Sequence, residues 1–335
     1  MDKKLKLGVA INDTWAFFEE IYALFIETHQ TTLFRPQQVQ IPLLSGRINN
    51  YLYKKSLNNF LESNSVCFFE WAGEFLSNAT SQPKKSGIVT RLHRYEMYQW
   101  ADKIHWENVD RVILVSQAKK IEIESRFPIL MDKTIVIPEG INLNRFTFSP
   151  KPFRKQLGIL CHLSPRKRVY ELIIAFVEGN FHKMGYTLHI GGGTHPKFPD
   201  YALALKLLVS NLGIKDSVIF HDHIIDQTKW FDEIDIFISN SYSEGLQVSP
   251  LEAMARGRFC LSHNWDGANE LLPTDYLFEL NTDLIEKILT YAELSENNKL
   301  KTLQLQRQMV EEKFNINYVA KSILNVVNEV AEMVS

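Results

Sequence analysis

The chain has 335 residues, enough for roughly two domains of ordinary size. Its hydrophobic content of 45% and charged content of 23% are typical of a soluble globular protein. Its formal net charge of −2 excludes the overall basicity that favours nucleic acid, so no nucleic-acid partner is expected.

The compartment is inferred from three features of the sequence. No apolar run reaches the ~18 residues that span a bilayer, and no signal peptide opens the chain. The three cysteines, Cys67, Cys161 and Cys260, are too few and too widely spaced for a disulfide framework or a zinc site. We therefore expect a cytoplasmic protein, and peripheral association with the inner face of a membrane stays open.

The first part of the chain alternates apolar strand-like runs with helical patterns. Strands are predicted over residues 5–11, 66–69, 88–92, 111–115 and 134–137. Helices are predicted after the first strand and over residues 49–61, 95–104 and 118–126. This alternation predicts a parallel α/β sheet. The stretch from Thr147 to Lys155 holds two prolines and three basic residues and predicts a linker between domains.

A second alternating series follows this linker. Strands are predicted over residues 157–161, 187–190, 217–220, 235–239 and 258–262, and helices over 169–178 and 202–212, with a helical turn over 228–232. A further helix begins near Ser249-Pro250 and is stopped by Gly257. From Leu284 onward the pattern is helical, and the last helix carries an apolar face. That face consists of Val319, Ile323, Val326, Val327 and Val330.

The stretch from Ser243 to Glu270 carries most of the polar chemistry. It places Glu244 and Glu252 between the carboxyl end of a predicted strand and the start of a helix, which is where open parallel sheets bind ligands. The backbone N–H groups and the dipole of such a helix start attract phosphate. Carboxylates are good partners for sugar hydroxyls. The stretch therefore predicts a ligand with phosphate and polyol parts.

The same stretch resembles a known signature. Glu244-Gly245, Glu252-Ala253-Met254-Ala255 and the downstream Gly267 and Glu270 are similar to the motif of the retaining glycosyltransferases of family 4, which have the GT-B fold. The resemblance implies two Rossmann-like parallel-sheet domains that face each other across a cleft. The first domain, 1–146 with a C-terminal helix over 318–335 crossing back to it, would admit an acceptor hydroxyl. The second domain, 147–317, would hold the donor.

The family also implies a reaction. A sugar would pass from a nucleotide-diphospho-sugar, UDP- or GDP-linked, to an acceptor hydroxyl with retention of anomeric configuration and without an obligatory metal or other cofactor. The acceptor, which is a glycan, a lipid-linked glycan or a small molecule, cannot be read from the sequence. A role in polysaccharide, glycolipid or other glycoconjugate biosynthesis is expected.

The resemblance assigns roles to residues of the key stretch. Glu244 would contact the transferred sugar, although a glutamate in a loop is otherwise often only solvated. Glu252 would hold the ribose hydroxyls, whereas its spacing from Ser249 alone favours a capping box. The backbone beside Glu244 would also bind the donor, through Gly245, Leu246, Gln247 and Val248.

The segment after the strand over 157–161 resembles the family's phosphate-binding turn. Lys167 matches the lysine of that turn and would neutralise charge on the departing diphosphate, although consecutive cations before a helix are otherwise typical of a solvated face. The family has an arginine where this chain has His162, and glycines where it has Cys161 and Arg168. Arg166 or Arg168 is a candidate substitute for the missing arginine.

Three further stretches contain candidate residues. His93 ends a strand and matches the family's active-site histidine, which helps to hold the sugar and the acceptor; a histidine there is otherwise structural. Gly191-Gly192-Gly193 follows a strand and is interpreted as a tight turn near the nucleotide, where Gly191 and Gly192 would approach the donor. The run from His221 to His223 is more typical of a polar turn than of a metal site, so no metal is expected.

Two other classes of function stay open. The departures at Cys161, His162 and Arg168 favour a non-catalytic accessory subunit with the GT-B fold. A sugar-nucleotide epimerase with the same fold is the other alternative, and it would act without an acceptor.

Overall fold

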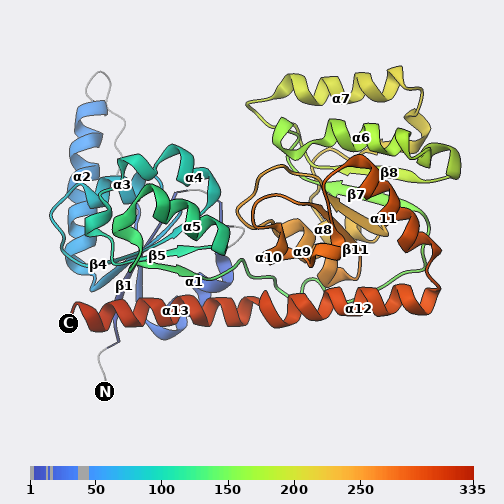
Figure 1. Cartoon of the computed structure of the whole chain (residues 1–335). Coiled ribbons are helices and arrows are strands. Elements are labelled where there is room, and N and C mark those ends of the chain that lie inside the picture. The colour runs from blue at the N-terminus through green and yellow to red at the C-terminus, as the bar shows by residue number, and fades with distance from the viewer. Residues whose placement is uncertain (1–3, 13, 16–17, 37–44) are drawn as a thin grey trace. The chain divides into compact units, whose positions relative to one another are not determined.

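The structure, a computed structural model, describes residues 4–12, 14–15, 18–36 and 45–335. Contacts divide the chain into two compact units, Met1–Gly140 with Ile316–Ser335, and Ile141–Asn315. Each unit holds one six-stranded parallel sheet (Figure 1). The predicted parallel α/β organisation is therefore confirmed in both units. The observed division after Gly140 lies a few residues before the predicted one.

The sheet of the first unit has the order β2-β1-β3-β4-β5-β6. Its strands are β1 (Lys6–Ile11), β2 (Gln30–Leu33), β3 (Val66–Glu70), β4 (Gly87–Leu92), β5 (Arg111–Leu114) and β6 (Thr134–Val136). Its helices are α1 (Glu19–Thr28), α2 (Ser45–Ser63), α3 (Glu74–Thr80), α4 (Arg94–Gln99), α5 (Gln117–Arg126) and α13 (Ile316–Met333).

The central strands of this sheet are apolar on both faces because a layer of helices covers each face. In β3, Val66 and Phe68 pack with residues of α1 and α13. The alternate residues Cys67 and Phe69 pack with residues of α2 and α3 on the other face. The continuous apolar run that predicted this strand therefore follows from its two buried faces.

The apolar face predicted for the last helix is confirmed, because all five of its residues are buried. Helix α13 packs against α1 and β4. A Cβ atom on Gly87 would lie 2.6 Å from Cγ1 of Val330, so the glycine lets the helix approach the strand closely. The terminal helix is thus an integral layer of the first unit.

The sheet of the second unit has the order β12-β11-β10-β7-β8-β9. Its strands are β7 (Gln156–Leu160), β8 (Thr187–Gly191), β9 (Val218–Phe220), β10 (Ile236–Ser239), β11 (Phe259–His263) and β12 (Leu277–Phe278). Its helices are α6 (Val169–Glu178), α7 (Pro199–Asn211), α8 (Gln227–Phe231), α9 (Val248–Arg256), α10 (Ala268–Leu271), α11 (Asn281–Glu293) and α12 (Glu296–Lys313).

The strand order of this second sheet reverses between β7 and β10. From β7 the chain builds outward through β8 and β9, and it then crosses to β10 and builds in the opposite direction through β11 and β12. The carboxyl ends of two such strands form a topological switch point, where open α/β sheets bind their ligands. The loops after β7 and β10 are therefore the expected ligand-binding loops of this unit.

Some predicted elements need correction. The helix predicted over 95–104 ends at Gln99 and is followed by a 3-10 turn, Ala101–Lys103. There Trp106 Nε1 donates to the Ala101 carbonyl oxygen at 3.0 Å. Strand β2 and helix α3 were not predicted. Strand β2 is an edge strand of sequence Gln-Thr-Thr-Leu, which lacks the apolar alternation that identifies strands. Residues 37–44, within a stretch the sequence did not assign, lie outside the described residues.

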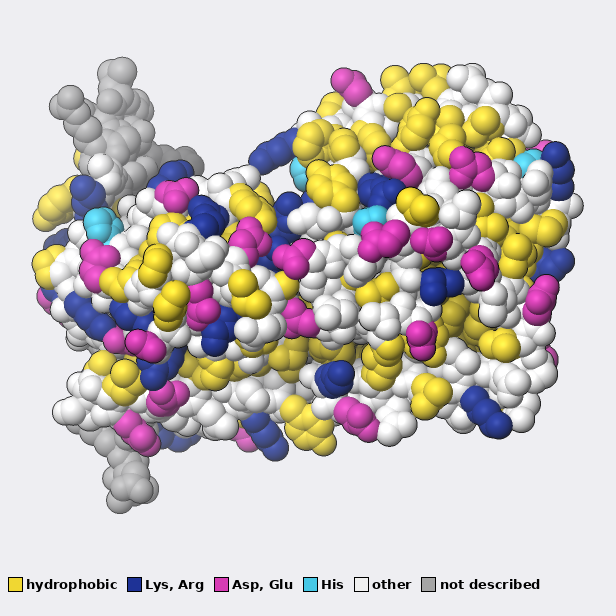
Figure 2. All heavy atoms as spheres, viewed as in Figure 1, with side chains coloured by type: hydrophobic (Ala, Val, Ile, Leu, Met, Phe, Trp, Pro, Cys, Tyr) yellow, Lys and Arg dark blue, Asp and Glu magenta, His cyan; other side chains and the backbone are white. Residues whose placement is uncertain are grey.

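The surface carries both signs of charge. Figure 2 shows lysine and arginine side chains interspersed with aspartate and glutamate over the face that it draws. Within the described residues, no helix combines the length and the apolar character that crossing a membrane requires.

Candidate functional site

Three predicted residues meet at the switch point of the second unit. Arg166 and Lys167 lie on a 3-10 turn that follows β7, and Glu244 lies on the loop that joins β10 to α9. Oε1 of Glu244 is 2.6 Å from Lys167 Nζ and 2.6 Å from an Arg166 guanidinium nitrogen. Arg166 also donates to the Ser243 carbonyl oxygen at 2.8 Å, which joins the two loops. We call these three side chains the Lys-Arg-Glu cluster.

The cluster is charged and has a net positive charge. Glu244 is 8% exposed, and its burial alone would favour the protonated form. The adjacent Lys167 and Arg166 outweigh this burial and lower the pKa of Glu244 to about 2. Two cations therefore face one carboxylate, and the cluster attracts an anion.

The start of α9 offers unused hydrogen-bond donors beside Glu244. Gln247 is the N-cap residue, and no side chain caps the helix. Within the part of the chain that the structure describes, no acceptor receives the backbone N–H groups of Gly245, Leu246, Gln247 and Val248. A helix start with free N–H groups and a positive dipole end is a ready anion site.

Glu252 lies in the second turn of the same helix. The capping box considered for Ser249 and Glu252 is wrong, because α9 begins at Val248 and Gln247 occupies the N-cap position. Burial raises the pKa of Glu252 to about 7, although the charge of Arg145 acts in the opposite direction. Among the described residues, the Glu252 carboxylate has neither a hydrogen bond nor an ion pair. Glu252 is thus a partly buried carboxylate available to a polar ligand.

The glycine run after β8 packs against the loop that follows β7. Gly192 has a φ of +117°, and a Cβ atom there would lie 1.8 Å from the Cys161 carbonyl oxygen. The Cys161 N–H donates to the Gly191 carbonyl oxygen at 3.0 Å. The Gly192 N–H donates to the Asp222 carbonyl oxygen at 2.7 Å. The run therefore lies beside His162, and the observed role of Gly192 is to permit this close backbone approach.

Two departures from the family turn have physical consequences. His162 lies at the surface, where partial desolvation and the neighbouring charges of His195 and Lys167 lower its pKa below 6.5. It is therefore neutral at pH 7 and does not supply the charge of an arginine. Arg168 has φ 49° and ψ 38°, the left-handed conformation that a glycine adopts without strain. Asn240 Nδ2 donates to the Arg168 carbonyl oxygen at 2.8 Å and helps to hold this turn.

His93 lies in the first unit, between β4 and α4, and is buried. Its Nε2 is 2.9 Å from Glu70 Oε1, and its Nδ1 is 3.1 Å from Glu139 Oε1. The Trp71 ring lies against it, with ring centroids 4.2 Å apart. Burial would lower the pKa of His93, but the hydrogen bonds to Glu139 and Glu70 outweigh it and raise the pKa to about 9. His93 is therefore a cation at neutral pH.

Sequence reasoning missed the charged residues around His93. Arg91 is fully buried, lies 3.3 Å from Glu70 and also pairs with Glu139. Arg91, His93, Glu70 and Glu139 form what we call the buried ion network, in which two cations balance two carboxylates. A signal was available, because Glu70 and Arg91 lie within apolar strand runs. Charged residues are rarely fully buried unless they are paired.

Comparison with known proteins adds an independent finding. Residues 154–293 match the family model of the glycosyl transferases group 1. This range lies within the second unit and contains the Lys-Arg-Glu cluster. The chain is also similar to the alpha-monoglucosyldiacylglycerol synthase of Streptococcus pneumoniae, with 26% identity over 231 residues, which is 62% of this chain and 51% of that protein. The chain thus spans about half the length of that relative.

Solved structures share the fold of the whole chain. Anabaena HepE in complex with UDP and glucose superposes with a TM-score of 0.76 at 17% identity, over 97% of this chain and 100% of that chain. A glycosyltransferase from Rickettsia africae superposes with a TM-score of 0.78 at 15% identity, over 98% of each chain. The fold is GT-B, as predicted. The family match thus lies in the second unit, and the shared fold extends over the whole chain.

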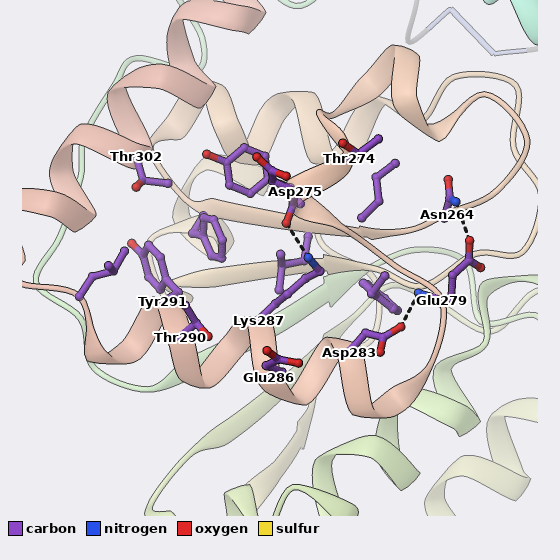
Figure 3. Close-up of a pocket in the computed structure, with 16 residues that line it drawn as sticks. Asn264, Thr274, Asp275, Glu279, Asp283, Glu286, Lys287, Thr290, Tyr291 and Thr302 are labelled. Carbon is purple, nitrogen blue, oxygen red and sulfur yellow. Dashed lines mark hydrogen bonds between the residues drawn. The ribbon is translucent and has the colours of Figure 1, made fainter.

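A cavity of about 570 Å³ lies elsewhere in the second GT-B unit, against β11, β12 and α11 (Figure 3). It contains none of the predicted site residues. Its polar groups largely serve local structure: Lys287 donates to the Asp275 carbonyl oxygen, and Asp283 accepts from the Glu279 N–H at the start of α11. The cavity therefore does not compete with the switch point as the candidate site.

Proposed function

We propose that this chain is a retaining glycosyltransferase, resembling family 4, that moves a sugar from a nucleotide-diphospho-sugar to an acceptor hydroxyl. One observation carries the proposal: the Lys-Arg-Glu cluster lies at the switch point beside the uncapped start of α9. Cations and free N–H groups suit a diphosphate, and the carboxylate suits sugar hydroxyls. The site therefore matches both parts of the expected donor.

The donor would engage the second unit through two features of α9. The diphosphate would accept hydrogen bonds from the backbone N–H groups of residues 245–248 and would face the positive end of the helix dipole. Glu252 would accept hydrogen bonds from the two ribose hydroxyls. Those donors stabilise the charged carboxylate, so donor binding would lower the pKa of Glu252 from about 7.

The chemistry follows from the charges of the cluster. Breaking the anomeric C–O bond produces an oxocarbenium-like sugar and a diphosphate anion. Lys167 and Arg166 would stabilise that anion, and a single such donor is commonly worth ~3–4 kcal/mol in the transition state. As the cations turn towards the diphosphate, Glu244 would become available to the hydroxyls of the transferred sugar.

Retention of configuration constrains the remaining steps. The acceptor oxygen must enter from the face of the sugar that the diphosphate leaves. The acceptor hydroxyl then lies beside the departing oxygen, and its proton passes to the diphosphate. In the first unit, His93, held as a cation by Glu70 and Glu139, stays the proposed counterpart of the family's active-site histidine. The reaction would need no metal, because Lys167 and Arg166 supply the required positive charge.

The similar proteins suggest the first substrates to test. HepE was crystallised with UDP and glucose, so UDP-glucose is the first donor. The pneumococcal relative is an alpha-monoglucosyldiacylglycerol synthase, so diacylglycerol is included among the acceptors. GDP-linked sugars and glycan acceptors complete the panel.

The test is a transfer assay followed by mass spectrometry. Wild-type protein is expected to add one sugar to an acceptor of the panel with release of the nucleoside diphosphate, and Glu244→Ala is expected to abolish transfer while keeping its circular dichroism spectrum. Lys215→Ala, which changes an exposed lysine outside the site, is the matched control. Conversion of the donor without acceptor would indicate the epimerase. Donor binding without any turnover would indicate the accessory subunit and overturn the enzymatic proposal.

A further inference from the structure

We propose that His189, His221 and Glu233 form a zinc-binding site in the second unit. His189 lies in β8, His221 follows β9, and Glu233 follows α8. One ligand atom from each side chain lies within 4.8 Å of the other two, and the described residues contain one such group. None of the three belongs to the Lys-Arg-Glu cluster, and the inference does not rest on the proposed function.

The orientation of His189 is set by a neighbouring amide. Gln156 Nε2 donates to the Arg154 carbonyl oxygen at 3.0 Å, so Gln156 Oε1 is the atom that faces His189. His189 Nε2 lies 2.8 Å from that oxygen and must donate its proton to it. The lone pair of His189 is therefore on Nδ1, which faces His221. Metal-binding histidines are typically oriented by such a bond from the ring nitrogen that does not bind the metal.

The distances fit a metal ion after a small adjustment. His189 Nδ1 is 2.8 Å from His221 Nε2, and Glu233 Oε2 is 4.0 Å from His189 Nδ1. Two ligands at tetrahedral zinc lie ~3.3 Å apart. The two histidines would separate slightly and the carboxylate would close in. In the hydrogen-bonded pair His221 Nε2 donates its proton to His189 Nδ1, so zinc binding would move that proton to His221 Nδ1, which Glu233 approaches to 3.8 Å, and would free the Nε2 lone pair.

Charge and access also suit zinc. His189 is buried, and its Nδ1 faces His221 and not solvent. The positive charge of Arg154 is paired with Asp235 at 2.9 Å. The Glu233 side chain is 52% exposed, which leaves an entry path and a fourth position for water. Two histidines, one carboxylate and a water are a familiar zinc ligand set.

The expected consequence is structural. The three ligands come from β8, from the segment after β9 and from the segment after α8, which are separate parts of the chain. Zinc would therefore cross-link three segments of the second unit and raise its stability by linkage. The sequence drew attention to His221 and His223, but His223 is not part of the cluster.

The experiment is a zinc titration of the full chain without a polyhistidine tag, after treatment with EDTA and dialysis. Isothermal titration calorimetry is expected to show about one Zn²⁺ per chain, and Co²⁺ is expected to give a visible absorption band typical of a tetrahedral site. His221→Ala and Glu233→Gln change surface-accessible positions, and each is expected to weaken Zn²⁺ binding at least ~10-fold. Gln156→Ala is expected to weaken it ~10–100-fold through loss of the oriented His189.

The control is His223→Ala, which removes an exposed histidine two positions from His221 and is expected to keep the wild-type affinity and the melting-temperature rise with Zn²⁺. Circular dichroism confirms that each variant is folded. The proposal is overturned if the wild-type chain takes up no Zn²⁺, or if His221→Ala and Glu233→Gln bind it as tightly as the wild type.

Discussion

The substitution Glu252→Gln tests whether the Glu252 carboxylate stabilises the fold or binds a ligand. Burial raises the pKa of Glu252 from 4.5 to about 7. This difference, at about 1.4 kcal/mol for each pH unit, corresponds to about 3 kcal/mol. Because solvent reaches the partly buried side chain and screens its charge, we expect ionisation of Glu252 to lower the free energy of unfolding by about 1–2 kcal/mol. The variant replaces the ionisable group with a neutral amide of similar shape.

The direction of the pH dependence follows from the raised pKa. The unfolded chain ionises Glu252 above pH 4.5, whereas the folded chain resists ionisation until about pH 7. Ionisation therefore destabilises the wild type progressively between these values, and fully above pH 7. Glu252→Gln is expected to match the wild type near pH 4 and to exceed its free energy of unfolding at pH 8 by about 1–2 kcal/mol.

The assay combines urea unfolding at several pH values with calorimetric titration of UDP and GDP. The variant is expected to gain stability at pH 8 and to bind the nucleotide at least ~10-fold more weakly, because ribose hydroxyls lose a charged acceptor. Glu286→Gln, at an exposed position of α11, is the control and should change neither quantity. A variant that is no more stable at pH 8 and binds nucleotide normally would refute the reasoning about Glu252.

Three further predictions concern the two units. Lys167→Ala is expected to lower kcat ~10²–10³-fold with the fold preserved, and wild-type turnover in the transfer assay would exclude Lys167 from the reaction. The pKa of His93 is raised from 6.5 to about 9, so the stability from its charged form is complete below pH 6.5 and is lost as pH rises through 9. Urea unfolding of the wild type should show this loss of stability between pH 7 and 10, and His93→Gln should not show it. The same pH dependence of the free energy of unfolding in both proteins would contradict the charged state of His93. Arg168→Gly should remove the strain of a non-glycine residue in the left-handed conformation and raise the free energy of unfolding by up to ~1 kcal/mol in thermal or urea unfolding. A clear loss of stability would show that contacts of the arginine side chain outweigh this backbone strain.

Local patterns in the sequence predicted most of the regular structure. Helix α6 has the predicted bounds, Val169–Glu178, because its apolar residues recur at helical spacing. The edge strand β2 and the short helix α3 escaped detection. An edge strand with half-exposed polar residues has no alternation to detect. Elements that bury much apolar surface are therefore predicted from the sequence more accurately than elements that bury little.

The site was predictable only in part, and for a different reason. The motif brought attention to Glu244, Glu252 and Lys167, and the strand order brings Glu244 and Lys167 together. The buried ion network joins Glu70, Arg91 and Glu139 across long stretches of sequence. No local pattern reports such pairings. The capping box at Glu252 could be rejected only after the first residue of α9 was known.

The central claim is that the start of α9 and the adjacent cations bind a diphosphate. Calorimetric titration of UDP and GDP against the wild type, Lys167→Ala and Lys215→Ala tests this claim most directly. We predict one nucleotide per chain for the wild type and for Lys215→Ala, and binding at least ~10-fold weaker for Lys167→Ala. Absence of binding to the wild type, or equal affinity in all three proteins, would contradict the account.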